Sequence, residues 1–282
     1  MEDGRLQIGE VEIIAFRDST IGFALEHMFP DVATETWAPY RERFPGAFAR
    51  DGWVIPVRAF VLREPGGSIV LVDTGIGTVG EITARMGGTG RLAEALAGVG
   101  VDPVDVDVVV LTHIHLDHSG GTIREDDGSY RPVFRRARHL LHRDDLDLVR
   151  RVAAQAPLYD ATILTLERLA LLEAVDDDRR VSDHLRVIHT PGHTPGSMSV
   201  LVVSGTDRAI LTGDAIAHPV LVSEPSWRYT SDADHHGAVG TRQALIDRIE
   251  SERMTLVPTH FPEPFGTIVR VEGRRYWQGR GG

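Results

Sequence analysis

The apolar residues of this chain fall into short runs that are typical of strands rather than long helices. Runs rich in valine and isoleucine and bounded by glycine, proline or aspartate favour strands. The pattern predicts strands at 6–16, 53–63, 68–72, 105–111, 132–134, 139–141, 185–189, 198–203, 208–212 and 255–258, and a closing hairpin over 267–277. The turn sequence Glu64-Pro65-Gly66-Gly67 joins 53–63 and 68–72 into a hairpin.

Apolar residues spaced close to 3.6 positions apart predict a smaller number of helices. They indicate a helix within 80–99, most clearly at 91–97, and further helices at 143–155 and 161–174. Asp234 is typical of an N-cap and predicts a helix from that point to about Glu250. The segment 21–48 is rich in aromatic residues and follows neither period, so we expect it to be irregular.

The composition is that of an ordinary soluble globular protein, with 42% hydrophobic and 25% charged residues in 282 positions. The apolar runs are too short to span a bilayer, and the sequence Met1-Glu2-Asp3-Gly4 lacks a basic, apolar signal pattern. We therefore expect a cytoplasmic protein that does not bind membranes. A net charge of −11 argues against nucleic-acid binding, which needs a basic surface.

Two residue types are missing, and their absence excludes several chemistries. The chain has no cysteine, which rules out disulfides, thiolate metal ligands and thiol nucleophiles. It has no lysine either, so all 30 basic residues are arginine and Schiff-base chemistry is excluded.

The strongest chemical signal is a cluster of metal-ligating side chains directly after the apolar run 108–111. His113, His115, Asp117 and His118 lie within six residues. Side chains on a strand alternate between its faces, which predicts that His113 and His115 point to the same side. We expect Asp117 and His118 in a tight turn that follows. One such histidine is usually a surface or capping residue, but four ligand-type residues in six positions favour a metal site.

Three further residues occupy similar positions at predicted strand ends. His193 follows the strand 185–189 in a Pro-Gly turn, Asp214 ends the strand 208–212, and His260 follows the strand 255–258. Imidazole and carboxylate ligands suit zinc or another first-row divalent ion. A carboxylate such as that of Asp214 can also bridge two cations.

Together with the segment Asp73-Thr74-Gly75, these motifs and their order resemble the metallo-β-lactamase fold superfamily of binuclear metallohydrolases. The resemblance implies a single αββα sandwich, an α+β fold, over residues 1–282. It implies two divalent ions, Zn²⁺ first and Mn²⁺, Fe²⁺ or Co²⁺ as alternatives. One ion would be held by His113, His115 and His193, the other by Asp117, His118 and His260, with Asp214 bridging. Asp73 would orient a ligand without binding metal.

The same resemblance implies a hydrolase in which a metal-bound hydroxide attacks the substrate. Asp214 or Asp117 would accept its proton and pass it to the leaving group. We expect His218, just after the bridging aspartate, to donate a hydrogen bond to substrate or to shuttle protons, with a purely structural role as the alternative.

The residues after Asp214 are similar to those of the methyl parathion hydrolase-like branch, whose members act on esters, lactones and phosphotriesters. The segments that carry this similarity are 213–219, 225–227, 232–234, 241–242 and 259–262. Quorum-quenching lactonases have a tyrosine three residues after the bridging aspartate, where this chain has Ala217. That difference weakens an assignment to acyl-homoserine lactones.

Aromatic residues indicate the kind of substrate. Those of the first 60 residues and of 227–229 either pack together or cover the metals, and as a group they favour a small, fairly apolar ligand; they are Phe23, Phe29, Trp37, Tyr40, Phe44, Phe48, Trp53, Trp227 and Tyr229. A glyoxalase-II-like thioesterase, a β-lactamase and a metal-binding protein without turnover are the alternatives. The thioesterase would need a basic site near the C-terminus, for which Arg270, Arg274, Arg275 and Arg280 are candidates. A homodimer is left open.

Overall fold

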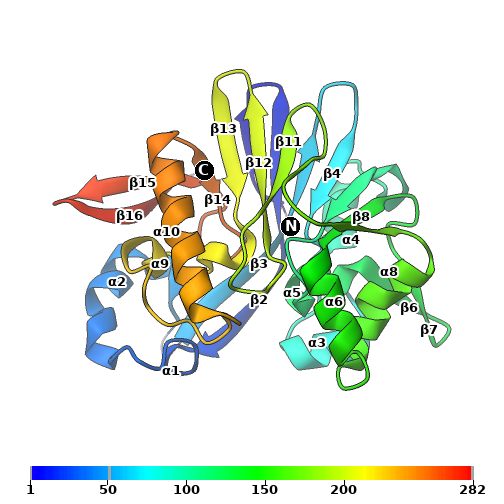
Figure 1. Cartoon of the computed structure of the whole chain (residues 1–282), viewed down its shortest axis with the longest axis horizontal. Coiled ribbons are helices and arrows are strands. Elements are labelled where there is room, and N and C mark those ends of the chain that lie inside the picture. Colours follow the sequence, from blue (N-terminus) through cyan, green and yellow to red (C-terminus); the bar gives the residue numbers. More distant parts are fainter. Residues whose placement is uncertain (1, 50–51, 281–282) are drawn as a thin grey trace.

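The computed structural model describes residues 2–49 and 52–280. Its strands form two sheets of seven strands each and a separate two-stranded hairpin. The two large sheets pack face to face, and helices cover the outer face of each (Figure 1). This arrangement confirms the predicted four-layer αββα sandwich.

The first sheet begins as an antiparallel meander and continues with parallel strands. Its strands, in spatial order, are β1 (Glu2–Ile8), β2 (Val11–Ala24), β3 (Gly52–Arg63), β4 (Ile69–Val72), β5 (Val108–Val110), β8 (Arg138–His142) and β9 (Leu172–Val175). Strands β4, β5, β8 and β9 run parallel to one another. The carboxyl ends of these four strands therefore lie at one edge of the sheet.

The second sheet is antiparallel except where β13 and β14 run parallel. Its strands, in order, are β10 (Arg179–Arg180), β11 (Leu185–His189), β12 (Met198–Ser204), β13 (Asp207–Leu211), β14 (Thr255–Val257), β15 (Gly266–Val271) and β16 (Arg274–Gly279). The separate hairpin consists of β6 (Ile123–Asp126) and β7 (Ser129–Pro132).

The helices are short apart from α6 and α10. They are α1 (Leu25–Met28), α2 (Ala38–Arg43), α3 (Gly80–Met86), α4 (Leu92–Gly98), α5 (Leu116–Ser119), α6 (Arg143–Val152), α7 (Pro157–Tyr159), α8 (Thr165–Arg168), α9 (Val220–Ser223) and α10 (His235–Ser251). Single turns of 3₁₀ helix are η1 (Thr34–Trp37), η2 (Pro45–Ala47), η3 (Pro103–Asp105), η4 (Gly120–Thr122) and η6 (Gly213–Ile216), and η5 (Asp160–Leu164) is a π-helical turn. Across the described residues, every helix is too short or too polar to cross a membrane.

The apolar runs recognised in the sequence are strands buried on both faces. In β4, Val70 and Val72 belong to the core between the sheets, whereas Leu71 packs with the helices on the outer face. In β13, Leu211 faces the first sheet and Ile210 faces the side covered by α10. Because each such side chain contributes about 1.5–3 kcal/mol when fully buried, both faces stabilise the sandwich.

Several predicted elements differ from the structure at a turn. The predicted strand 6–16 is in fact two strands, because Gly9 adopts a φ of +53° and reverses the chain. A β-carbon at Gly9 would lie 2.4 Å from the Ser204 hydroxyl oxygen, so only glycine fits. The predicted irregular segment 21–48 starts inside β2 and continues as short helices.

Two other predictions assigned the wrong structure to part of a segment. In place of the predicted strand 132–134, the structure has strand β7, which ends at Pro132. Phe134 packs in the core outside the first sheet. The predicted helix 161–174 stops at Arg168, and its last residues form β9. Strand β9 pairs with β8, so tertiary pairing outweighs the helical spacing of its leucines.

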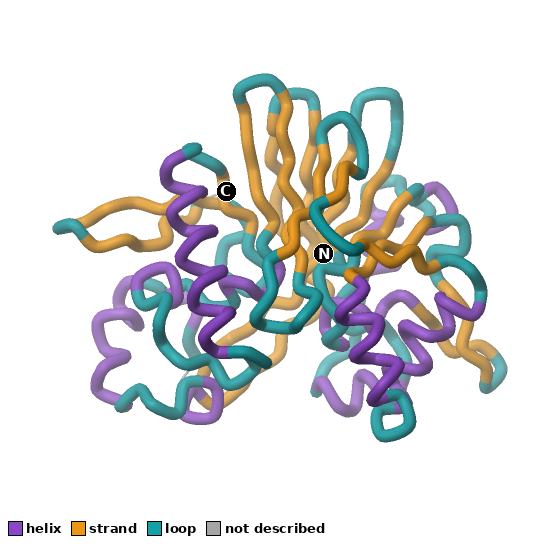
Figure 2. Tube along the Cα trace, in the orientation of Figure 1, coloured by secondary structure: helices purple, strands orange, loops and turns teal. Residues whose placement is uncertain are grey.

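The strands that precede the predicted ligands all end at one edge of the sandwich. These strands are β4, β5, β11, β13 and β14. The loops after them gather between the two groups of helices (Figure 2). Parallel pairing of β4 with β5 and of β13 with β14 brings their loops side by side.

Candidate metal centre

The structure brings all seven predicted ligand residues into one cluster at this edge of the sandwich. Three groups of ligand atoms lie within 4.8 Å of one another: His113, His115 and His193; His113, His118 and Asp214; and Asp117, His118 and His260. Every residue in the cluster is buried except Asp117 and His115, which are partly exposed.

His113 and His115 are not held in place by a strand, as was predicted. Strand β5 ends at Val110, so both histidines lie in the loop after it rather than on a strand. Asp73 sets the path of this loop, because its carboxylate accepts hydrogen bonds from the Thr112 backbone N–H (2.8 Å) and hydroxyl (2.9 Å). The predicted turn with Asp117 and His118 is the short helix α5.

The first group of ligand atoms is an imidazole triad. His113 Nε2 and His193 Nε2 each lie 3.0 Å from His115 Nδ1. Asp214 Oδ2 is 3.4 Å from His193 Nε2 and completes the group. Unprotonated nitrogens brought this close repel one another unless a proton or a cation lies between them.

The second group uses the other oxygen of the same carboxylate. Asp214 Oδ1 is 3.0 Å from His260 Nε2 and 3.4 Å from His118 Nε2. Asp117 Oδ2 lies 3.4 Å from His260 Nε2 and 3.6 Å from His118 Nε2. Asp214 therefore stands between two sets of ligand atoms, as a bridging carboxylate would.

The spacing and chemistry of these atoms fit two divalent ions. Ligand atoms about 2.1 Å from a tetrahedral zinc ion are about 3.4 Å from one another. The separations of 3.0–3.6 Å in both groups agree with that geometry. Nitrogen and carboxylate donors are those that zinc and its first-row neighbours prefer.

Hydrogen bonds on the outer side of the imidazoles fix which nitrogen faces the cluster. His118 Nδ1 donates to Asp73 (2.8 Å), His193 Nδ1 lies 3.3 Å from Asp232, and His260 Nδ1 donates to the Pro56 carbonyl (2.8 Å). Each ring is thereby held with its other nitrogen toward the cluster, where that nitrogen can bind a metal.

The electrostatics of the two groups differ. Burial holds the pKa of His113 well below its usual value and lowers that of His115 to about 4, so both are neutral and ready to bind metal. Burial also acts on His118, but the carboxylates of Asp117, Asp73 and Asp214 outweigh it and raise the pKa of His118 well above its usual value. The second group therefore attracts positive charge.

Two fully buried arginines hold the loops that carry ligands, and neither was identified from the sequence. Arg242 pairs with Asp232 at 2.9 Å and donates to the Ala215 and Pro225 carbonyls. Arg58 donates to the carbonyls of Thr259, Phe261 and Pro262 around His260.

A signal for both arginines was present in the sequence. Arg242 occupies the apolar stripe of its helix between Ala238 and Leu245, and Arg58 interrupts the apolar strand 54–62. A cation at a core position requires a buried partner. The sequence alone did not show that the buried partner of Arg242 is Asp232.

Asp145 at the start of α6 joins the two histidine loops. Its carboxylate accepts hydrogen bonds from the Ile114 N–H (3.2 Å), the Thr194 hydroxyl (2.8 Å) and the Gly196 N–H (2.7 Å). Ile114 lies between His113 and His115, and Thr194 follows His193. Asp145 therefore fixes the distance between the loops that form the imidazole triad.

We expect Asp145→Asn to change how stability depends on pH. Burial raises the pKa of Asp145 from 3.8 to about 6, despite the opposing hydrogen bonds. A raised folded-state pKa means that the stability contributed by this carboxyl is present below about pH 4 and is lost as pH rises through 6. The free energy of unfolding of the variant, minus that of the wild type, should therefore increase by on the order of 2 kcal/mol from pH 4 to pH 7.

Urea unfolding of both chelator-treated proteins at several pH values measures this difference. Asp147→Asn is the matched control, because Asp147 lies on the same helix and its side chain is partly exposed, in an ion pair with Arg150. A difference between Asp145→Asn and wild type that stays constant from pH 4 to pH 7 would contradict the expected titration.

A cavity of about 310 Å³ opens above the cluster. His115, Asp117, His193, Asp214 and His260 line it. Its other walls are mainly apolar or aromatic and are formed by Ile21, Phe23, Met28, Trp53, Ile55, Met86, Leu116, Tyr159 and Tyr229, with Arg85 and Ser231. Only part of the predicted aromatic set therefore faces the cavity.

His218 does not line the cavity and is packed among aromatic residues, of which Trp53 reaches the cavity and Phe48 does not. Its ring is 4.8 Å from that of Trp53 and 5.3 Å from that of Phe48. Nδ1 accepts a hydrogen bond from the Val220 N–H, and burial lowers the pKa of His218 to about 3. His218 is therefore neutral and fully buried, and its predicted part in catalysis stays a prediction.

His142 and His189, which were not among the predicted ligands, meet in the structure beside Asp144. Their rings stack 3.9 Å apart at an interplanar angle of 12°. The Nε2 atoms donate to the carbonyls of Asp176 and Pro195, so the Nδ1 lone pairs lie in parallel planes. Parallel lone pairs do not converge on one ion, and this trio does not fit a metal in the present geometry.

The sequence is similar to those of proteins that are named as N-acyl homoserine lactonases. An N-acyl homoserine lactonase from Bacillus sp is 28% identical over 180 residues, which are 57% of this chain and 64% of that protein. A lactonase from Bacillus thuringiensis is 26% identical over 175 residues, 56% of this chain and 62% of the relative. The chain thus matches less than two thirds of the length of these relatives.

Solved structures are similar over nearly the whole chain. A hydrolase of the beta lactamase superfamily, AbOPH, has a TM-score of 0.82 at 22% identity, covering 98% of this chain and 97% of that chain. AidC, a dizinc quorum-quenching lactonase solved with a product, has a TM-score of 0.81 at 20% identity, covering 99% and 97%. At these identities the likeness shows the fold.

The family model described as the metallo-beta-lactamase superfamily matches residues 52–260. That range starts at β3, ends at His260 and includes all seven clustered side chains. The chain belongs to the metallo-β-lactamase superfamily.

Proposed function

We propose that this protein is a binuclear metal-dependent hydrolase that cleaves a lactone, ester or phosphotriester bond in a small, fairly apolar substrate. The observation that carries the proposal is the position of Asp214, whose two oxygens face two separate ligand sets at the floor of one cavity. The lactonase relatives support the same class of reaction.

Two divalent ions bound here would supply an activated water and a Lewis acid for the substrate oxygen. His113, His115 and His193 would hold one ion, and Asp117, His118 and His260 the other, with Asp214 shared. Asp117 faces the cavity with 14% of its side chain exposed, so it can accept a proton and return it to the leaving group. The apolar walls favour an uncharged substrate and restrict access of water.

Tyr229 is the other polar group that we assign to the reaction. It lines the cavity with its ring stacked on that of His193, at a centroid distance of 5.8 Å. Burial, with the charge of Asp214 nearby, raises the pKa of Tyr229 well above 10. Its hydroxyl therefore stays protonated at neutral pH and can donate a hydrogen bond to a substrate oxygen as negative charge develops on it.

The thioesterase alternative depended on free basic residues near the C-terminus. In the structure, Arg270 and Arg275 pair with Glu250, and Arg274 pairs with Glu224. Neither these three nor Arg280, the fourth candidate, lines the cavity above the cluster. A charged thiol carrier therefore finds no cationic site among these residues, and we favour the uncharged substrate.

The function can be tested with a panel of a medium-chain lactone, an aryl ester, a phosphotriester, a charged glutathione thioester and a β-lactam. Zinc-loaded protein with measured metal content should hydrolyse one or more of the first three fastest. Chelation should remove that activity, and added Zn²⁺ should restore it in proportion to the metal bound. Turnover of the thioester alone, or hydrolysis that is independent of metal content, would contradict the proposal.

The same assay tests the role of Tyr229. Tyr229→Phe should lower kcat on every hydrolysed substrate by about 10–100-fold and leave the metal content unchanged. Tyr276→Phe is the matched control, because Tyr276 lies on β16 away from the cavity. An unchanged kcat in Tyr229→Phe would leave the hydrolase proposal standing but remove Tyr229 from it.

A further inference from the structure

A second and larger cavity, of about 870 Å³, lies apart from the metal centre. Its walls come from the loop at Gly77, from α4, from η3 and from the β6–β7 hairpin with the residues that follow it. It has no lining residue in common with the cavity above the cluster. Its volume is within the range of about 300–1,000 Å³ that is usual for small-molecule sites.

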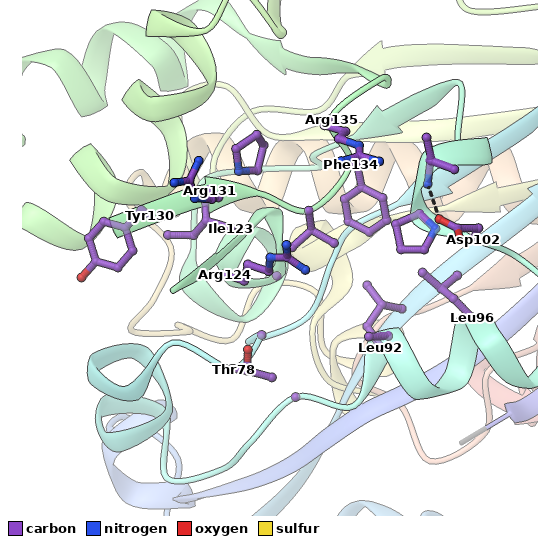
Figure 3. Close-up of a pocket in the computed structure, with 18 of the residues that line it drawn as sticks. Thr78, Leu92, Leu96, Asp102, Ile123, Arg124, Tyr130, Arg131, Phe134 and Arg135 are labelled. Atoms are coloured by element: carbon purple, nitrogen blue, oxygen red, sulfur yellow. Dashed lines mark hydrogen bonds between the residues drawn. The ribbon is translucent and has the colours of Figure 1, made fainter. Parts of the chain in front are cut away.

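One part of this cavity is strongly apolar. Figure 3 shows Tyr130 at one end of the hollow and, at the other end, Leu92, Leu96 and Phe134, which belong to the buried core behind the wall. Four large hydrophobic side chains are exposed in the part of the chain that the structure describes, and two of them, Tyr130 and Leu169, line this cavity. These two side chains therefore present apolar surface to a ligand in the cavity.

The same cavity is basic, although the protein has a net charge of −11. Its lining contains four arginines and two carboxylates. Both carboxylates are engaged, since Glu94 pairs with Arg91 and Asp102 accepts the Val104 N–H. The other three arginines are Arg124, Arg131 and Arg135.

These three arginines are poorly neutralised. Arg124 and Arg131 lie 3.9 and 3.6 Å from Asp126, which is itself exposed. Among residues 2–49 and 52–280, no carboxylate lies within ion-pair distance of Arg135. Guanidinium groups are well suited to bind carboxylates through paired hydrogen bonds.

We propose that this cavity binds a small organic carboxylate with an apolar body, its chain against the exposed side chains of Tyr130 and Leu169 and its anionic group on the arginines. The combination of exposed apolar side chains and poorly neutralised guanidinium groups selects a ligand that is both hydrophobic and anionic. The inference concerns a site separate from the metal centre and does not depend on the proposed hydrolytic function.

One wall of the cavity packs against a segment that orients a predicted metal ligand. Gly121 lines the cavity and follows α5, which carries Asp117 and His118. A β-carbon at Gly121 would lie 2.1 Å from the Thr74 carbonyl oxygen, so this part of the wall packs directly on the segment after Asp73. A ligand that shifts Gly121 would therefore also move the loop that orients His118.

Isothermal titration of the full chain with sodium octanoate tests the proposal. Octanoate should bind saturably with a Kd of about 1 mM or lower. Arg124→Gln and Arg135→Gln should each weaken binding by about tenfold, since each removes a charge-assisted contact. Arg124 and Arg135 are exposed, so these variants should fold, which a thermal unfolding curve checks. Arg136→Gln is the matched control, because Arg136 is exposed and does not line the cavity.

Additional ligands and variants identify the chemistry and the location. Octan-1-ol, which lacks the charge, and inorganic phosphate, which lacks the chain, should both bind much more weakly than octanoate. Thr78→Trp, which fills the mouth of the cavity, should abolish octanoate binding, whereas Arg85→Gln at the metal-centre cavity should leave it unchanged. The proposal is overturned if octanoate fails to saturate, if Arg136→Gln weakens binding as much as Arg135→Gln, or if Arg85→Gln alone removes it.

Discussion

Asp214→Ala is expected to abolish both catalysis and tight binding of the second metal ion. Asp214 is the one side chain with an oxygen in each ligand group, at 3.4 Å from His193 Nε2 and 3.0 Å from His260 Nε2. Alanine leaves three ligands in each group: three buried or nearly buried imidazoles in the first, and two imidazoles with the partly exposed Asp117 in the second. We expect bound zinc to fall from two ions per chain toward one and kcat/KM to fall by at least about 1,000-fold.

Metal analysis after dialysis and steady-state kinetics measure these two effects separately. Asp177→Ala, at an exposed position, is the control for removal of one carboxylate and should keep both metal and activity. If Asp214→Ala retained two ions and full turnover, the shared-carboxylate arrangement would be wrong. If it retained two ions but lost turnover, the role of Asp214 would lie in proton transfer instead of metal binding.

The second large effect is expected for Arg242→Met, although Arg242 touches neither a ligand atom nor the cavity. The variant leaves the Asp232 carboxylate charged, fully buried and unpaired, which costs about 3–5 kcal/mol of folding stability. It also frees Asp232 from its partner, so that His193 loses its orientation, and releases the Ala215 carbonyl beside Asp214. Activity should fall together with stability.

A double variant separates the charge effect from a packing effect. Asp232→Asn combined with Arg242→Met removes both charges while the amide oxygen can still accept from His193 Nδ1, so it should recover more than half of the lost stability. Arg248→Met on the same helix is the control, because its ion pair with Glu252 is partly exposed and contributes about 0.5 kcal/mol. A double variant no more stable than Arg242→Met would show that the arginine acts through packing alone.

The ligand cluster could be predicted from the sequence because its members follow apolar strands in parallel or adjacent positions. The runs before Asp73, His113, Asp214 and His260 are strands buried on both faces, and such strands are recognisable from composition alone. Once those strands share a sheet edge, their loops must meet. The candidate ligands could then be chosen from the residue types in these loops, without knowledge of side-chain orientation.

The remaining parts of the site depend on contacts that no local pattern encodes. Asp145 lies in the first turn of an ordinary amphipathic helix, and only tertiary packing shows that it joins the loops after β5 and β11. Tertiary packing also decides which aromatic side chains face the cavity. Phe23 faces it, whereas Phe48 packs against His218. Strand β9 was predicted as part of a helix for the same reason. Its pairing with β8 outweighs the helical spacing of its leucines.

The two ligand groups are each divided between the sheets, and this division bears on how the protein folds. His113 and His118 follow the first sheet, while His193 and His260 follow the second, and His118 and His260 are 142 positions apart in the chain. Neither sheet alone carries a complete set, so the binding pockets exist only after the two have docked. Contacts of such high sequence separation form slowly. Uptake of metal should therefore trail the collapse of the chain, and a chelator should speed separation of the sheets while leaving the first steps of folding unaffected.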